Sequence, residues 1–172
     1  AKIMHETTVK TIKTMNNNEE DFSRIVKENK GTIYTVCYMF SKDQDEVDDM
    51  FQDVLVNLWK GFQSFRQDSK VSTWIYRVAL NTCISAERKK KQHPTERLSM
   101  DINLYEDSDE GSRQVQQLHS LIGKLDVIDR ALVLMWLENM SYDEIACILG
   151  ISAKNVGVKL VRIKEKLIKM NK

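Results

Sequence analysis

The side chains with the clearest capacity for binding chemistry lie near the C-terminal end of the sequence, on one face of an expected helix. Positions that recur every three or four residues share a helical face, and this face holds Asn155, Val158, Lys159, Arg162, Lys166 and Lys169, with Lys154 next to it. Lysine and arginine bind phosphate groups, and Asn155, Lys159 and Arg162 carry donors that match base edges in a DNA major groove. The pattern predicts nucleic-acid binding, although many lysine-rich helical faces contact only water.

The segment before this helix, residues 140–152 with the sequence MSYDEIACILGIS, has the features that place such a helix on DNA. Ser141 and Glu144 form an S-x-x-E capping box that opens a short helix, and Gly150 suits the positive φ of a tight turn. Ser152 can then cap the last helix. A short helix, a glycine turn and a second helix form a helix-turn-helix. The apolar residues spaced to pack these helices are Ile145, Ala146, Leu149, Ile151, Val156, Leu160, Ile163 and Leu167.

A second distinct segment, residues 43–53, carries six acidic groups and no basic group, whereas residues 150–172 carry seven basic groups and one acidic group. The net charge of the chain is only +1, so segregation of charge suggests different partners for different segments. Opposite the apolar stripe of the acidic helix, a partly acidic face suits a basic partner helix, and it holds Asp49, Gln52, Asp53 and Val56. On the pattern alone, a solvated charge run is the simpler alternative.

The composition of the 172-residue chain points to helices throughout. One proline and six glycines are too few turn formers for an all-β protein, and hydrophobic residues make up 42%, enough for a packed core. Before the proline, apolar residues at helical spacing predict three helices, at about residues 19–40, 45–62 and 73–91, with a polar loop at 64–72. We therefore expect an all-α fold.

A domain boundary is predicted where the helical pattern stops. Residues 93–112 contain Pro94 and an acidic stretch without apolar periodicity, which is typical of a flexible linker. Beyond it, Asp126 and Asn139 are expected to cap the two ends of one helix. The expected organisation is two small helical domains joined by a flexible acidic linker: a flexible N-terminal extension at 1–18, the first domain at 19–92, the linker at 93–112 and the helix-turn-helix domain at 113–172.

Other function classes lack their signatures in this sequence. The three cysteines, Cys37, Cys83 and Cys147, are widely spaced in apolar helical settings, which predicts buried thiols in a reducing cytoplasm rather than disulfides or a metal site. There is no phosphate-binding glycine loop and no H-E-x-x-H motif, so we expect no catalytic residues, no metal and no cofactor. No apolar run reaches membrane-spanning length and the first residues lack a signal core, which predicts a cytoplasmic protein without membrane insertion.

Three segments together resemble the sigma-70 family of RNA polymerase sigma factors, in its two-domain extracytoplasmic-function (ECF) subgroup. DDMFQDVLVNLW is similar to the acidic polymerase-binding helix, and STWIYRVALNTCISAERKKK is similar to the promoter-opening helix. LDVIDRALVLMWLENMSYDEIACILGISAKNVGVKLVRIKEKL is similar to the C-terminal promoter-reading domain. The resemblance covers roughly residues 21–91 and 118–167. Each motif alone is moderately specific, but all three in this order and at this spacing are highly specific.

The resemblance implies a bacterial alternative sigma factor that binds core RNA polymerase, recognises two promoter elements and promotes DNA opening without catalysing a reaction. The residues implied in docking on the clamp coiled coil of the largest polymerase subunit are Asp49, Gln52, Asp53 and Val56. Those implied in binding the minus-ten element are Arg77, Asn81, Arg88 and Lys89. In similar proteins the preceding loop, here residues 64–72, captures a base flipped from the non-template strand.

The C-terminal domain would read the minus-thirty-five element and contact the polymerase flap. The residues implied in this promoter contact are Lys154, Asn155, Val158, Lys159, Arg162 and Lys166. The acidic linker would thread toward the active-site cleft and the RNA exit path. The family also implies regulation by an anti-sigma factor that holds the two domains together.

Several positions have structural alternatives or depart from the family pattern. Trp74 is flanked by apolar residues at helical spacing and is expected in the core rather than as a stacking platform. The basic cluster at 88–91 also suits a helix C-terminus, although the pattern match favours phosphate contact. The family often has proline where Asp126 stands, and commonly lysine and serine where this chain has Gly157 and Val158. A glycine inside a helix costs about 1 kcal/mol relative to alanine, and here it either permits close approach to DNA or shifts the sequence preference.

Two rival functions are considered beside this one. A one-component transcription regulator would join the helix-turn-helix to a helical sensor domain and bind duplex DNA as a dimer without polymerase. That alternative leaves the acidic helix and the basic end of the third helix unexplained. A helical enzyme would need a constellation of catalytic residues, and nothing in the sequence assembles one.

Overall fold

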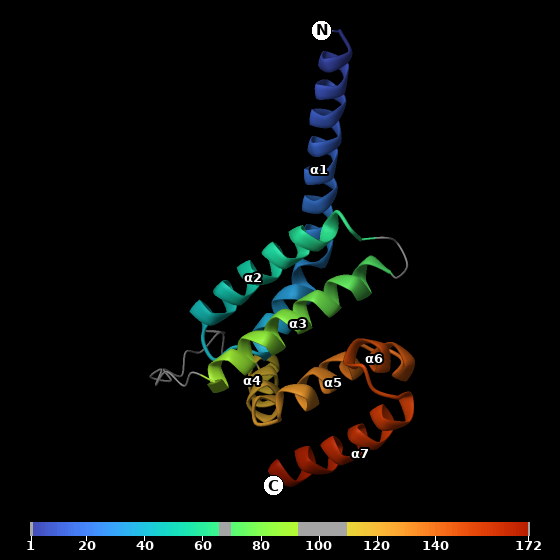
Figure 1. Cartoon of the computed structure of the whole chain (residues 1–172). Helices are drawn as coiled ribbons and strands as arrows, with labels where there is room; N and C mark the ends of the chain where they lie inside the picture. Colours follow the sequence, from blue (N-terminus) through green and yellow to red (C-terminus); the bar gives the residue numbers. More distant parts are fainter. Residues whose placement is uncertain (1, 66–69, 93–109, 172) are drawn as a thin grey trace.

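The computed structural model describes residues 2–65, 70–92 and 110–171, and throughout these ranges the chain forms helices joined by turns, with no strand. This confirms the all-α prediction. In chain order, the helices within these ranges are α1 (Lys2–Met39), α2 (Gln44–Phe62), α3 (Val71–Gln92), α4 (Glu110–Gly123), α5 (Val127–Leu137), α6 (Tyr142–Leu149) and α7 (Ala153–Met170) (Figure 1). In the described part of the chain, no helix has both the length and the apolar character needed to cross a membrane.

Helix α2 forms where the sequence predicts it, because a capping residue and an apolar stripe act together. The Glu46 amide donates a hydrogen bond of 2.8 Å to the Asp43 carboxylate, which satisfies one of the free N–H groups of the first turn. The stripe is buried against α1 and α3, which also contact each other. Its fully buried members are Val47, Met50, Val54 and Leu58.

Helix α1 begins at Lys2, well before the start expected near residue 19. The segment 1–18, expected as a flexible extension outside the first helix, is therefore helical from Lys2 onward. Residues 2–18 contain neither proline nor glycine, so nothing in the backbone chemistry stops the helix from continuing. The expected start of the helix comes from the spacing of apolar residues. That spacing marks the part of a helix that packs against a core, and a helix can continue beyond that part. The first part of α1 accordingly projects beyond the other helices (Figure 1).

The helix-turn-helix prediction is confirmed by α6, the turn after it and α7. The Glu144 amide donates to Ser141 Oγ at 3.1 Å, and the Ser141 amide donates to Glu144 Oε2 at 3.2 Å, which completes the predicted capping box. Gly150 has a φ of 69° at the end of α6, the left-handed conformation that favours glycine. The Asn155 amide donates to the Ser152 hydroxyl at 3.2 Å and caps the start of α7.

Helix α5 lies under both helices of this motif, and only one of its two expected caps is formed. Asn139 has a φ of 57° and takes the predicted left-handed conformation after the helix. Asp126 is the N-cap residue, as predicted, but its side chain makes no capping hydrogen bond, so the prediction holds for the position and fails for the bond. Its ψ of 155° starts the helix without the side-chain oxygen bonding the first-turn amides. Buried residues from α5, α6 and α7 form the core of the second domain, among them Ala131, Leu132, Ile145, Val156, Leu160 and Ile163.

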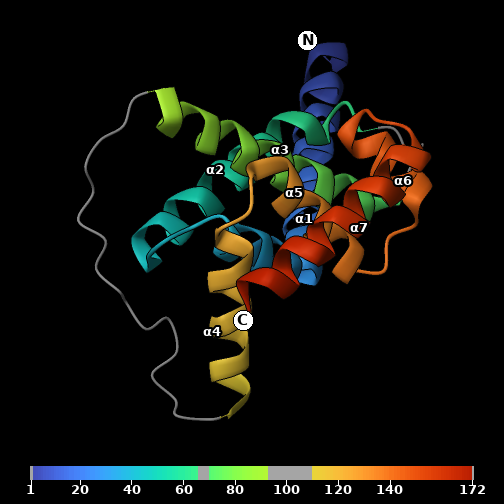
Figure 2. The same ribbon diagram turned by 90° about the horizontal axis from the view of Figure 1, so that it is seen from below.

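The two domains pack against each other. Figure 2 shows α5 between α3 and α7, and contacts also join α4 to the end of α1. The buried side chains of both domains belong to one apolar cluster. Burial raises the pKa of Tyr76 on α3, with a further contribution from the Glu138 carboxylate just beyond α5 and a smaller one from Cys83. Of the linker expected at 93–112, residues 93–109 lie outside the described residues and 110–112 belong to α4.

Two of the three cysteines are buried as predicted, and the third is not. Cys37 on α1 and Cys83 on α3 are fully buried. A hydrogen bond with the Cys37 thiol, together with burial, raises the pKa of the Cys83 thiol. Cys147 is exposed, because the eight-residue α6 buries Ile145 and Ala146 and turns the following position to solvent.

Candidate nucleic-acid interface

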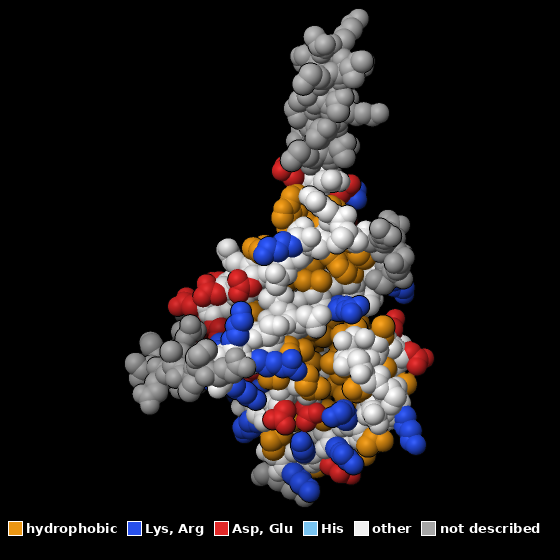
Figure 3. All heavy atoms as spheres, in the orientation of Figure 1, with side chains coloured by type: hydrophobic (Ala, Val, Ile, Leu, Met, Phe, Trp, Pro, Cys, Tyr) orange, Lys and Arg blue, Asp and Glu red, His pale blue; other side chains and the backbone are white. Residues whose placement is uncertain are grey.

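The face of α7 singled out in the sequence lies on the surface of the second domain. Val156, Leu160 and Ile163 point inward, so the opposite side of the helix faces solvent. Figure 3 shows Lys and Arg side chains gathered around the end of the molecule where α7 lies. Of the six residues predicted to contact DNA, one is half-buried, Lys159, and five are exposed: Lys154, Asn155, Val158, Arg162 and Lys166.

One residue of this face is already engaged within the protein. Lys166 Nζ lies 3.4 Å from Asp129 Oδ2 on α5. The Lys166 side chain is 57% exposed, whereas Asp129 is 14% exposed. A phosphate contact by Lys166 would therefore compete with Asp129 for the same ammonium group.

The glycine within α7 lies next to an aromatic ring of α6. A Cβ added at Gly157 would lie 3.4 Å from Cε2 of Tyr142. The Tyr142 ring, at the start of α6, is 44% exposed and lies over the α7 backbone. The Tyr142 ring therefore packs beside Gly157 at van der Waals distance.

We expect Gly157→Ala to stabilise the protein by up to about 1 kcal/mol, because alanine favours the helix and a methyl group at 3.4 Å from Tyr142 is in ordinary van der Waals contact. Urea denaturation followed by circular dichroism measures the change. Gly31→Ala is the matched control, since Gly31 lies in α1 with nothing within 4 Å of its added Cβ. A loss of stability in Gly157→Ala alone would mean that the Tyr142 ring tolerates no added atom.

The acidic helix α2 presents its predicted face to solvent. All four residues assigned to this face are exposed: Asp49, Gln52, Asp53 and Val56. Figure 3 shows acidic side chains gathered over one end of α2. Glu46, another member of the acidic run, is only 5% exposed; it accepts a hydrogen bond of 2.8 Å from the Lys42 amide and pairs with Lys90 of α3. Glu46 therefore fastens α2 to α3 and is withdrawn from any partner surface.

A groove of about 630 Å³ between α2 and α3 brings two of the predicted residue sets together. The members that line it are Asp53 and Val56 from α2 and Asn81 and Lys89 from α3. Arg77 and Arg88 are exposed on α3 but do not line this groove. The groove therefore brings together two of the four residues predicted to bind polymerase and two of the four predicted to bind the minus-ten element.

The same groove contains polar residues that sequence reasoning missed. Asn57 Nδ2 donates to Thr82 Oγ1 at 3.0 Å, a bond between α2 and α3. Thr82 Oγ1 also donates to the Val78 carbonyl oxygen at 2.7 Å, and Ser85 lines the groove one turn further along α3. Each of these residues sits at the edge of an amphipathic stripe, where polar side chains are common. Residue type alone therefore does not mark them; the hydrogen bond between Asn57 of α2 and Thr82 of α3 does.

The charged side chains at the C-terminal end of α3 do not all face solvent. Arg88 and Lys89 face solvent, as a DNA-contacting surface requires. Lys90 pairs with α2 through the ion pair described above. Glu87 Oε1 lies 3.7 Å from Arg130 Nη1 on α5. The basic cluster at 88–91 is therefore not a single solvent-facing patch, because Lys90 is held against α2.

Trp74 is a packing residue at the start of α3, as expected. It is half-buried against the core, and its ring stacks on Phe65 with a centroid distance of 4.6 Å and an interplanar angle of 29°. A Cβ added at Gly61 would lie 3.3 Å from Trp74 Cζ2, so α2 approaches the ring closely. Of the loop expected at 64–72, residues 66–69 lie outside the described residues, and α3 already begins at Val71.

His119 of α4 connects the two domains, a role that sequence reasoning missed. Its Nε2 lies 2.9 Å from the Tyr38 carbonyl oxygen and 3.1 Å from that of Ser41. Because carbonyl oxygens only accept, Nε2 carries the proton and donates to both. The His119 ring also stacks on the Tyr38 ring, with centroids 4.4 Å apart. His119 thereby binds the end of α1, where the helix leaves carbonyl groups without helical partners.

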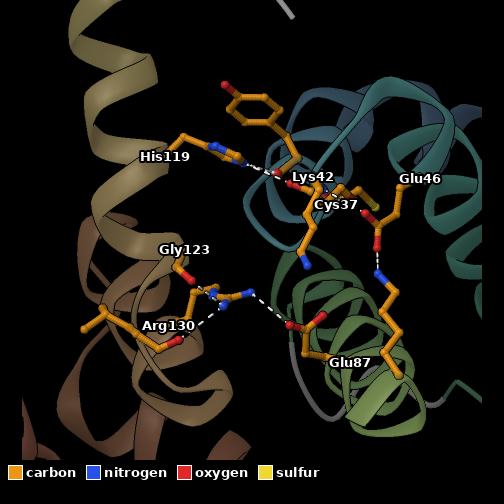
Figure 4. A network of polar contacts seen from close by, with 11 residues as sticks. Cys37, Lys42, Glu46, Glu87, His119, Gly123 and Arg130 are labelled. Atoms are coloured by element: carbon orange, nitrogen blue, oxygen red, sulfur yellow. Dashed lines mark hydrogen bonds and ion pairs between the residues drawn. The ribbon is translucent and has the colours of Figure 1, made fainter. Parts of the chain in front are cut away.

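Arg130 of α5 is the second connection, and it is only 7% exposed. Its Nη2 donates to the carbonyl oxygens of Gly123 at 3.0 Å and Leu125 at 3.1 Å, which holds the corner between α4 and α5. Its Nη1 faces Glu87 of the first domain, and its guanidinium carbon lies 5.2 Å from the centre of the Phe40 ring. Figure 4 shows His119 and Arg130 reaching across to the first domain. Neither residue stands in a recognisable motif, so only the packed fold identifies them.

The candidate interface consists of separate surfaces rather than one site. The predicted residues of α7 do not line the α2–α3 groove, and they do not line a second cavity, which lies between the domains beside Arg130. Over the described ranges, no group of three or more His, Cys, Asp or Glu residues is placed to hold a metal ion. The arrangement suits the binding of large charged partners on several faces.

Two family profiles match the sequence, and together they span both domains. The profile of Sigma-70 region 2 matches residues 25–93, which run from the last part of α1 to the end of α3. The profile of Sigma-70, region 4 matches residues 115–167, which run from α4 into the last turns of α7. The order of the two matches is the order of the two packed domains.

Relatives of known type match nearly the whole chain. The ECF RNA polymerase sigma factor SigW of Bacillus subtilis is 30% identical over an alignment of 178 positions, which covers 93% of this chain and 94% of that protein. SigM, an ECF sigma factor of Mycobacterium tuberculosis, is 25% identical over 87% of this chain and 76% of its own length. The fold is shared with the sigma factor RpoE of Bartonella quintana, solved with the anti-sigma factor NepR, at a TM-score of 0.72 and 20% identity over 87% of this chain and 96% of that one. The chain therefore belongs to the extracytoplasmic-function group of the sigma-70 family of RNA polymerase sigma factors.

Proposed function

We propose that the protein is an alternative sigma factor that binds core RNA polymerase, recognises a minus-thirty-five and a minus-ten promoter element and promotes the opening of DNA. The observation that carries this proposal is the exposed basic face of α7 on a helix-turn-helix, in a chain of the ECF group. The protein supplies binding and positioning, and the polymerase performs the chemistry.

The acidic face of α2 is the proposed contact with the clamp coiled coil of the largest polymerase subunit. The face carries two carboxylates, from Asp49 and Asp53, and one side-chain amide, from Gln52. Val56 is 52% exposed and adds an apolar contact. Complementary charges speed encounter and fix the register of an interface, and a central apolar residue excludes water from it. The withdrawal of Glu46 into the α2–α3 contact leaves a compact face for the partner.

The outer side of α3 is the proposed contact with the minus-ten element. Asn81 and Lys89 share the groove that Asp53 lines, and Arg77 and Arg88 are exposed on the same helix. A polymerase docked on α2 would therefore bring the promoter strand next to α3. Basic side chains there would hold the phosphates of a strand whose bases leave the duplex. We extend this proposal to the loop at 64–72 as the place where a flipped base is captured.

The second domain is proposed to read the minus-thirty-five element with α7 in the major groove. Asn155, Lys159 and Arg162 would reach base edges, and Lys154 and Lys166 would hold phosphates. Val158, 43% exposed, would contact an apolar group such as a thymine methyl. The same domain would touch the polymerase flap, and the linker would lead toward the active-site cleft.

Promoter recognition on this scheme requires the two domains to separate. Elements centred near positions 35 and 10 are about 25 base pairs apart, roughly 85 Å of B-DNA at 3.4 Å per base pair. A compact chain of this length has a radius of gyration of only about 16 Å. The packed arrangement of Figure 2 is therefore proposed as a closed form that opens on polymerase.

An anti-sigma factor is the proposed regulator of that opening. Solved relatives with this fold include CnrH in complex with the cytosolic domain of CnrY and RpoE in complex with NepR. A protein that binds both domains at once would stabilise the closed form by mass action. Such a partner would keep the α2 and α7 faces from engaging polymerase and promoter together.

Run-off transcription tests the proposed function directly. The protein is mixed with sigma-free core polymerase and fragmented DNA from the source genome, and transcript starts are mapped. We expect discrete starts that vanish when the protein is omitted, each preceded by two shared sequence elements. Duplex binding by the protein alone, with no transcripts, would instead identify a one-component helix-turn-helix regulator.

Arg162→Ala is expected to weaken recognition of the minus-thirty-five element by about 1–3 kcal/mol if Arg162 contacts a base. Arg162 is exposed on α7, so its removal leaves the fold of the domain intact. Competition binding of the polymerase holoenzyme to a panel of upstream sequences measures the loss. Arg113→Ala, an exposed arginine outside α7, serves as the control. A loss that is equal on every upstream sequence would make Arg162 a phosphate contact and contradict base reading.

A further inference from the structure

The space between the two domains is a cavity with a concentrated positive charge. It has a volume of about 360 Å³ and lies where the end of α1 faces the corner between α4 and α5. Four basic residues line it, together with two acidic ones: Lys42, Lys91, Lys124 and Arg130 against Glu87 and Asp126. The difference of four and two gives the cavity a formal charge of +2 with His119 neutral. A concentration of positive charge of this kind attracts anions.

The start of α5 opens on the same cavity. Asp126 and Val127 line it, and the Asp126 side chain makes no capping hydrogen bond. The first-turn amides of α5 therefore have no side-chain acceptor, and the positive end of the helix dipole is directed at the cavity. Amides and dipole together form the arrangement that binds phosphate groups at helix N-termini.

Arg130 supplies an independent sign that an acceptor belongs here. Its side chain is 92% buried and lines the cavity. Two of its nitrogens have partners, but Nε is buried without a hydrogen-bond acceptor. A buried donor without a partner costs about 1–3 kcal/mol. Figure 4 shows Lys42 extending from the first domain toward the space beside Arg130 and Glu87, so donors of both domains converge.

We propose that this cavity binds a phosphate dianion, as a small phosphate monoester, between the two domains. A phosphate monoester carries a charge of about −1.5 to −2 at neutral pH, which matches the +2 of the lining, whereas a single carboxylate would compensate only half of it. Its oxygens would accept from the α5 amides and from the lysines, with a small adjustment bringing one toward Arg130 Nε. The remaining wall mixes polar residues with the apolar side chains of Phe40, Leu125 and Val127, and these apolar side chains suit the organic part of the ester.

A ligand held in this way would stabilise the closed form. Lys42 and Lys91 belong to the first domain, and Lys124 and the start of α5 belong to the second. A ligand that touches both domains binds the closed form more tightly than an open one and shifts the population accordingly. The site therefore couples a small phosphorylated molecule to the opening of the protein.

Titration of the full-length, ¹⁵N-labelled protein with phenyl phosphate at constant ionic strength tests the site. The amide signals of Val127 and Ile128 are expected to shift in a saturable way. Lys42→Gln and Lys124→Gln should each weaken binding about fivefold; both lysines are exposed, so the fold is retained. Lys30→Gln, at an exposed lysine of α1 that does not line the cavity, is the matched control. Equal affinity for inorganic phosphate would identify the phosphate group alone as the ligand, and weaker affinity would identify an organic ester.

The proposal is overturned by either of two results. Shifts confined to the amides of α7, abolished by Lys159→Gln, would place the anion on the DNA-facing helix. Unchanged affinity in both Lys42→Gln and Lys124→Gln would remove the cavity lysines from binding. Each result is independent of run-off transcription, so the phosphate site can fail while the sigma-factor function stands.

Discussion

Asp53→Lys is expected to abolish binding to core RNA polymerase while leaving the fold intact. Asp53 is exposed on α2 and lines the α2–α3 groove, so its replacement disturbs no buried contact. On the proposed interface the new lysine would face a basic partner helix, and like charges at an interface cost several kcal/mol. Such a change corresponds to a loss of affinity on the order of a hundredfold or more.

Fluorescence anisotropy of the labelled protein with core polymerase measures this loss, and circular dichroism verifies the helices. Glu28→Lys is the matched control, because it makes the same charge reversal at an exposed position of α1. The control variant should bind core polymerase as tightly as the unchanged protein. Equal affinity of Asp53→Lys and Glu28→Lys for core would remove α2 from the polymerase interface.

The elements predicted most accurately from sequence are those decided by neighbouring residues. The capping box of Ser141 and Glu144, the left-handed Asn139 and the glycine turn at Gly150 all form as expected. Each depends on backbone groups within a few residues, so residue type and spacing suffice. The exposed faces of α2 and α7 follow from periodicity for the same reason.

The predictions that failed depend on what lies beyond a helix's own sequence. An apolar stripe could not show that α1 starts at Lys2, because a stripe marks the part of a helix that packs and not where the helix begins. In the sequence Glu46 is one of several neighbouring acidic residues. In the structure its ion pair with Lys90 holds α2 against α3. Cys147 lies in an apolar segment and is exposed, since a short helix buries only part of its surface.

The contacts between the domains were least accessible to sequence reasoning. His119 lies 81 positions from Tyr38 along the chain, and no local pattern connects them. A histidine in a polar stretch and an arginine in an apolar helix have many structural roles. Only the packing of α4 and α5 against α1 and α3 gives His119 and Arg130 their partners.

Arg130→Ala is expected to open the molecule, with a loss of stability of about 3 kcal/mol. The change removes a buried cation and leaves Glu87, 17% exposed, without its partner. It also leaves the carbonyl oxygens of Gly123 and Leu125 without a donor. Small-angle X-ray scattering should report a larger radius of gyration, and urea denaturation a lower midpoint. Arg113→Ala, an exposed arginine of α4, should change neither quantity.

His119→Ala separates opening of the domains from damage to the second domain. It removes the bonds to the Tyr38 and Ser41 carbonyls and the ring stack, but it leaves the α4–α5 corner held by Arg130 intact. Expansion in both variants, with helicity retained, would mean that these two residues hold the domains closed. Because opening exposes both promoter-facing domains, both variants should also bind core polymerase more readily at low concentration. Unchanged scattering in both would mean that the apolar cluster shared by the two domains closes the molecule without them.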